Sequence, residues 1–99
     1  MNQRLMQEAF PELKIQIEQA AEFIQQEELI IAEALYRDLL EKNENCPVAL
    51  YGLSELAEKI SDQQLREELL RRAIEQIKEI EVDNKKEIIA CWEQQLMNK

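Results

Sequence analysis

The sequence predicts an all-α fold, and three observations lead to that prediction. The 99 residues include one Gly, two Pro and no Thr, beside abundant Glu, Gln, Leu, Ile and Lys. This is the composition of helices joined by very short turns. Apolar residues recur at the spacing of one helix face along most of the chain, and the apolar pattern of residues 31–40 returns 34 residues later, in residues 65–74. A fixed period of this length is typical of stacked helical hairpins.

The apolar spacing predicts five helices, at about residues 11–26, 28–42, 47–60, 61–82 and 84–98. Pro11 and Pro47 fit the first turn of the first and third helices, where the missing N–H costs nothing. Ser61 and Gln64 form the pattern of a capping box and are expected to open the fourth helix. Residues 1–10 either add a short helical turn or fray. Because the connections are only a few residues long, successive helices are expected to be antiparallel neighbours.

The repeated residues resemble the tetratricopeptide (TPR) family. The hairpin of that family carries a large residue, a Leu–small pair and an aromatic residue on its first helix, and an Ala, an aromatic residue and a second Ala on its second helix. In the first unit the matching residues are Ile17, Ala20, Ala21, Ile24, Ala32, Tyr36 and Leu39, and in the second they are Leu50, Leu53, Ser54, Ala57, Arg66, Leu70 and Ala73. Arg66 departs from the usual Ala. The first helices align at a spacing of 33 residues, which predicts one extra residue in the second turn, around 58–61.

The resemblance implies a single TPR-like domain over residues 1–99. Antiparallel αα-hairpins at residues 11–43 and 47–81 would stack as a short right-handed array of five helices, closed by the helix at 84–98. The alternative is a five-helix bundle in which the spacing is coincidental.

The net charge and the two cysteines limit which partners and sites are expected. A net charge of −9 repels phosphate, so no nucleic-acid partner is expected, and another protein or peptide is the expected partner. No segment is apolar enough to suggest membrane insertion or a signal peptide, so a cytoplasmic location is expected. Cys46 and Cys91 are isolated, and without His they predict no metal site. Reduced thiols are expected, with a disulfide left open.

No catalytic chemistry is expected, so the chain is predicted not to be an enzyme and to need no cofactor. The chain contains no His, which excludes Ser–His and Cys–His pairs. Gly52 is the only glycine, so no phosphate-binding loop is present, and its expected role is close helix packing. The numerous glutamates are expected to form solvated helix faces.

The resemblance also implies where a partner would bind, because TPR ligands lie along the concave face formed mainly by the first helices. Carried onto this chain, the predicted partner-binding residues are Ile15, Glu18, Glu22, Val48, Tyr51, Glu55 and Ile89. Their acidic character favours a basic or amphipathic peptide or helix, with Tyr51 as an aromatic anchor. The expected function is therefore that of an adaptor or chaperone-like module. Two alternatives are that the glutamates simply face water while Tyr51 is partly buried, and that the chain is a self-assembling structural protein, a homodimer formed through its last helix or N-terminal segment.

Overall fold

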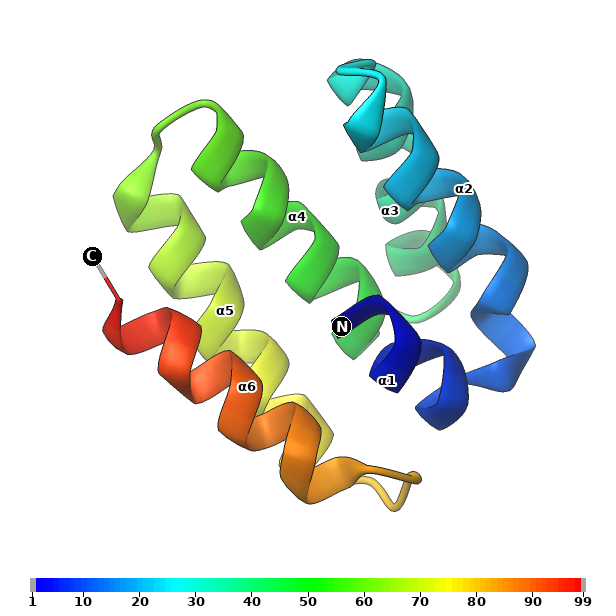
Figure 1. Ribbon diagram of the computed structural model, residues 1–99, viewed down its shortest axis with the longest axis vertical. Helices are drawn as coiled ribbons and strands as arrows, with labels where there is room; N and C mark the ends of the chain where they lie inside the picture. Colours follow the sequence, from blue (N-terminus) through cyan, green and yellow to red (C-terminus); the bar gives the residue numbers. More distant parts are fainter. Residues whose placement is uncertain (1, 99) are drawn as a thin grey trace.

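The computed structural model describes residues 2–98 and is built from helices in that range (Figure 1). Its elements are α1 (Asn2–Ala9), a 3-10 turn η1 (Pro11–Leu13), α2 (Lys14–Gln25), α3 (Leu29–Lys42), α4 (Pro47–Lys59), α5 (Gln63–Lys78) and α6 (Lys85–Met97). The all-α prediction is confirmed. The predicted number of helices is wrong, because residues 2–98 contain six α-helices and not five.

The additional helix is α1, in the segment that was expected to add one turn or to fray. Eight residues are too few for a stable isolated helix, so tertiary contacts must hold α1 in place. Met6, Ala9 and Phe10 supply them, since each is less than 8% exposed. A short 3-10 turn that starts at Pro11 then separates α1 from α2, so the helix predicted from residue 11 begins at Lys14.

The two hairpins, α2–α3 and α4–α5, have the same turn at an offset of 34 residues. In the first turn the N–H of Glu28 donates to the carbonyl oxygen of Phe23 at 2.8 Å; in the second the N–H of Asp62 donates to that of Ala57 at 2.9 Å. The residue before each donor is left-handed, with φ of 63° and 62°. The extra residue predicted in the second turn is therefore wrong, because both turns have the same length.

The start of α5 also differs from the sequence prediction. Ser61 occupies the left-handed turn position and does not cap the helix. Asp62 is the N-cap, and its side chain accepts a hydrogen bond from the backbone N–H of Leu65 at 3.2 Å. Asp is as good a cap as Ser, and the turn geometry that the two hairpins share decides between the two residues.

Burial follows the same period. Tyr36 and Leu70 are both buried, and so are the pairs that flank them at this offset, Ala32 with Arg66 and Leu39 with Ala73. Ile31 and Leu65, which belong to the same sequence pattern, are instead 43% and 40% exposed. The 34-residue period in side-chain exposure therefore holds on the exposed faces of α3 and α5 as well as on their buried faces.

Helix α4 is the centre of the molecule. It packs against α3 and α5, and nearly every residue from Pro47 to Ala57 is buried. Gly52 allows the close approach of α3, as expected from the sequence: a Cβ added there would overlap three carbons of the Tyr36 ring. Replacing Gly52 with any larger residue therefore requires the Tyr36 ring or one of the two helices to move.

Helix α1 connects the first hairpin to the last helix, because it packs against both α2 and α6 (Figure 1). The Asn84 side chain donates to Glu8 Oε1 at 2.6 Å, which ties α1 to the turn before α6. Ile88 and Trp92 of α6 are buried, so the last helix covers the second hairpin. No disulfide joins Cys46 and Cys91, so the disulfide that the sequence left open is not formed.

Candidate functional site

The structure separates the predicted partner-binding residues into exposed and buried groups. Ile15 is 66% exposed, Glu18 and Glu22 are exposed on α2, and Glu55 and Ile89 are partly buried. Val48 and Tyr51 are each only 1% exposed. Neither side chain is therefore open at the surface, although Tyr51 lines two cavities, and their direct contact with a partner stays a prediction. Both lie on α4, and α4 is covered on several sides because it is the central helix.

Tyr51 supports the core. Its ring stacks on that of Trp92, with centroids 4.8 Å apart and planes 8° from parallel. Its hydroxyl accepts a hydrogen bond from Gln95 Nε2 at 2.9 Å. Stacking and hydrogen bonding together orient the phenol, so it forms a rigid wall for the space beside it.

Two cavities lie on the face formed by α2, α4 and α6, and Glu55 lines both. The first, of about 310 Å³, is lined by Gln3, Met6, Ile17, Ala21, Ile24, Gln25, Tyr36, Tyr51 and Glu55. The second, of about 330 Å³, is lined by Tyr51, Glu55, Glu58, Gln63, Arg66, Gln95 and Asn98. Because Gln3 and Met6 belong to α1, that helix covers part of the face that the resemblance assigns to ligands.

The carboxyl group of Glu55 has an unusual pKa. Burial, assisted by the negative charge of Glu58 and opposed by Lys59, raises the pKa of the Glu55 carboxyl to about 7. No residue among 2–98 forms a hydrogen bond or an ion pair with it. Burial, with Glu55 nearby, also raises the pKa of Tyr36 above its ordinary value. A partly buried carboxylate without a partner is costly in a folded protein, and such groups are concentrated at functional sites.

Arg66 also lines the second cavity, but its side chain already forms hydrogen bonds within the fold. Its guanidinium is buried and donates to the carbonyl oxygens of Gln95 and Asn98, both at 3.1 Å. These carbonyls lie at the carboxyl end of α6, where a cation is favourable. Sequence reasoning missed this role, although the departure from the usual Ala at position 66 was the signal that could have revealed it.

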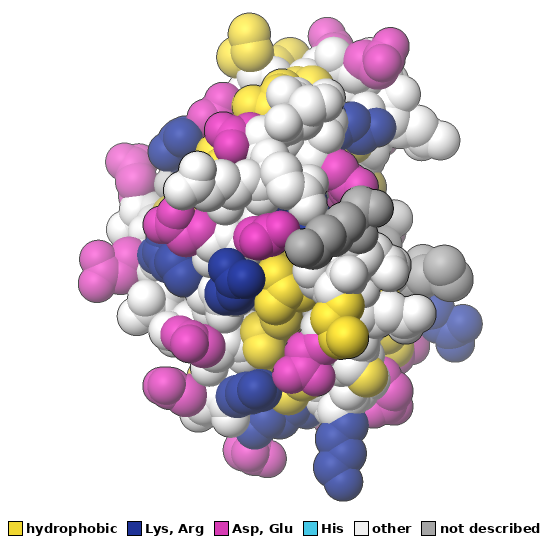
Figure 2. All heavy atoms as spheres, turned by 90° about the vertical axis from the view of Figure 1, so that its left-hand side faces the viewer, with side chains coloured by type: hydrophobic (Ala, Val, Ile, Leu, Met, Phe, Trp, Pro, Cys, Tyr) yellow, Lys and Arg dark blue, Asp and Glu magenta, His cyan; other side chains and the backbone are white. Residues whose placement is uncertain are grey.

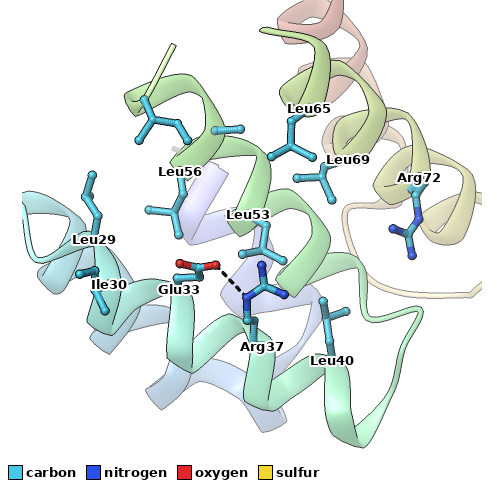
Figure 3. Close-up of a pocket in the computed structure, with 12 residues that line it drawn as sticks. Leu29, Ile30, Glu33, Arg37, Leu40, Leu53, Leu56, Leu65, Leu69 and Arg72 are labelled. Atoms are coloured by element: carbon cyan, nitrogen blue, oxygen red, sulfur yellow. Dashed lines mark hydrogen bonds and ion pairs between the residues drawn. The ribbon is translucent and has the colours of Figure 1, made fainter. Parts of the chain in front are cut away.

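An apolar groove lies on a different side of the molecule, between α3 and α5 with α4 as its floor (Figure 3). The groove has a volume of about 340 Å³ and is lined by Leu29, Ile30, Glu33, Arg37, Leu40, Leu53, Leu56, Ala57, Ile60, Leu65, Leu69 and Arg72. Ile30 and Ile60 at its rim are 84% and 64% exposed. Sequence reasoning did not predict it. The signal was the apolar residues of α3 and α5 that fall outside the buried stripe.

The charge of the groove contrasts with that of the whole chain. One acidic residue and two basic residues line it, whereas the chain carries −9. Arg37 Nε and Glu33 Oε2 form an ion pair at 2.8 Å along the surface of α3 (Figure 3). On the face of α5 and α6, by comparison, acidic and basic side chains are interspersed around a narrow strip of hydrophobic ones (Figure 2).

Comparisons with protein-family models, curated proteins and solved structures found no match to this chain. Within residues 2–98, none of the helices combines the length and apolar character needed to cross a bilayer.

Proposed function

We propose that the chain is a non-enzymatic protein–protein interaction module that binds a basic segment of another protein on the face formed by α2, α4 and α6. A lysine or arginine side chain of that segment would enter one of the cavities beside Glu55. The observation that carries the proposal is the partly buried Glu55 carboxyl, which lines both cavities and has no partner among the described residues.

A TPR-like architecture supports an interaction role. The matching turns of the two hairpins and the equivalent burial at an offset of 34 residues favour two repeats of one structural unit. Small residues at Ala32, Ser54 and Ala73 are buried, where they allow close helix contact. We therefore propose a short right-handed TPR-like array that is closed by α6 and partly covered by α1. Such arrays present extended binding surfaces to a partner.

The electrostatics select a cationic ligand. An ammonium or guanidinium group beside Glu55 would stabilise the ionised carboxyl that burial disfavours, and it would release a proton in doing so. The exposed carboxylates of Glu18 and Glu22 add negative potential on α2 of the same face, and the net charge of −9 would steer a basic partner toward the molecule.

The surroundings of the cavities favour binding over catalysis. The hydroxyl of Ser54 is buried and donates to the carbonyl oxygen of Tyr51 at 2.6 Å, so it is already engaged. The chain has no His to act as a base. Glu55 itself has aromatic and amide side chains as neighbours, and these are suited to holding a cation in place.

A titration with a defined probe tests the proposal. A trilysine peptide added to the ¹⁵N-labelled protein should shift the Gln95 side-chain amide signals and the backbone signals around Glu55, with an affinity in the millimolar range of about −4 kcal/mol. The same peptide acetylated on every Nε should shift neither. Glu55→Gln should remove the response, whereas Glu22→Gln, on the exposed part of the same face, should retain most of it. Equal shifts with the acetylated peptide, or an unchanged response in Glu55→Gln, would refute the proposal.

A further inference from the structure

The exposed side of α3 has a symmetric pattern that the proposed function does not use. Ile30, Glu33, Arg37 and Leu40 all line the apolar groove, and they follow one another at intervals of three, four and three residues. The outer two are apolar and the inner two have opposite charges. The pattern is therefore unchanged when the helix is reversed, except that the two charges exchange places.

Such a pattern is complementary to itself. If two copies of α3 lie antiparallel across a two-fold axis at the level of Leu35, the Glu33 carboxylate of one copy faces the Arg37 guanidinium of the other, and the reverse contact forms at the same time. Ile30 of each copy then faces Leu40 of the other. Ala34, next to the axis, is exposed and small, so the two helices can approach closely.

We propose that the apolar groove is the dimer interface of this protein and that its occupant is a second copy of the chain, with α3 packed antiparallel against α3. Ile30, which is 84% exposed, is buried against the groove of the opposite copy. The two ion pairs of Glu33 with Arg37 join into a ring of four alternating charges. A network of this kind is worth more than an isolated surface pair.

The charge of the groove explains why two acidic molecules can meet there. Each copy carries −9, so most surfaces of the protein repel one another. The groove lining carries one acidic and two basic side chains, because Arg72 on α5 adds a positive charge opposite α3 (Figure 3). Glu55 and its cavities belong to a different face, so dimerisation and cation binding can be tested independently.

Charge reversal tests the pairing directly. Sedimentation velocity on the full chain, up to about 1 mM, should show a reversible dimer. Glu33→Arg and Arg37→Glu each place like charges at both contacts and should raise the dimer Kd at least about tenfold. The double variant that carries both changes should return to the wild-type Kd. A mixture of the two single variants should form a heterodimer more tightly than either forms a homodimer.

Matched controls separate the interface from a loss of folding. Arg71→Glu breaks an equivalent i, i+4 pair with Glu67 on α5, outside the groove, and should leave the dimer unchanged. Ile30→Ser should weaken the dimer, whereas Ile15→Ser, at an exposed position on α2, should not. Circular dichroism should show every variant folded. A monomer throughout the concentration range, or a dimer that neither the charge reversals nor their recombination affects, would overturn the proposal.

Discussion

The contact between Gly52 and Tyr36 leads to a prediction whose magnitude can be worked from the structure. An alanine at position 52 places its Cβ on three ring carbons of Tyr36, at the hydroxyl-bearing end of the ring. Overpacking of this kind costs about 1–3 kcal/mol. Alanine recovers about 1 kcal/mol because it favours the helix more than glycine does. Gly52→Ala should therefore lower the free energy of unfolding by up to about 2 kcal/mol.

A double-mutant cycle identifies the cause of that loss. Tyr36→Phe keeps all three carbons that the new methyl meets, so Gly52→Ala should cost as much in that background as in the wild type. Tyr36→Leu removes those carbons, so in that background Gly52→Ala should cost nothing or should stabilise the protein. Urea unfolding monitored by circular dichroism gives all the required free energies. An equal cost of Gly52→Ala in the Tyr36→Phe and Tyr36→Leu backgrounds would refute the argument that the Tyr36 ring excludes a side chain at position 52.

Three further predictions concern the cavities and their walls. The folded-state pKa of Glu55 is about 7, above the ordinary 4.5, so the contribution of its protonated carboxyl to the free energy of unfolding is fully present below pH 4.5 and is lost as the pH rises through 7. Urea unfolding should therefore show wild type losing about 3 kcal/mol relative to Glu55→Gln between these limits. Arg66→Met removes two hydrogen bonds at the end of α6 and should cost about 2 kcal/mol, with hydrogen exchange accelerated mainly in residues 95–98. Tyr51→Ala removes a buried ring and should cost about 3–5 kcal/mol in thermal unfolding, as expected for a core residue and not for a surface anchor.

Much of the fold could be predicted from the sequence because local signals and packing agree there. The helices from α2 to α6 follow apolar spacing, and Pro47 marks the start of α4 where the structure has it. The role of Gly52 was also predictable, because a glycine inside a helix needs a packing reason. The predictions about the turns failed at Ser61, because two neighbouring residues can both cap a helix and only the backbone geometry chooses between them.

The site was harder to predict than the fold. Position in a repeat indicates which helix face a residue occupies, but it does not say whether another element covers that face. Glu55 was identified, yet its lack of a partner depends on where α4, α5 and α6 place their side chains. Tyr51 was predicted to be an aromatic anchor, with its partial burial left as an alternative. The sequence could not decide between them, because the stacking of Trp92 on Tyr51 joins residues that are far apart in the chain.

The sequence by itself determined the helical class, the 34-residue period and the acidic charge, because each depends on composition and on spacing within one helix. Only the tertiary structure decided that residues 2–9 form a helix across the predicted binding face, that Arg66 holds the end of α6, and that an apolar groove lies open between α3 and α5. These features depend on contacts between distant segments. A short helix such as α1 is stable only where it finds a surface to cover.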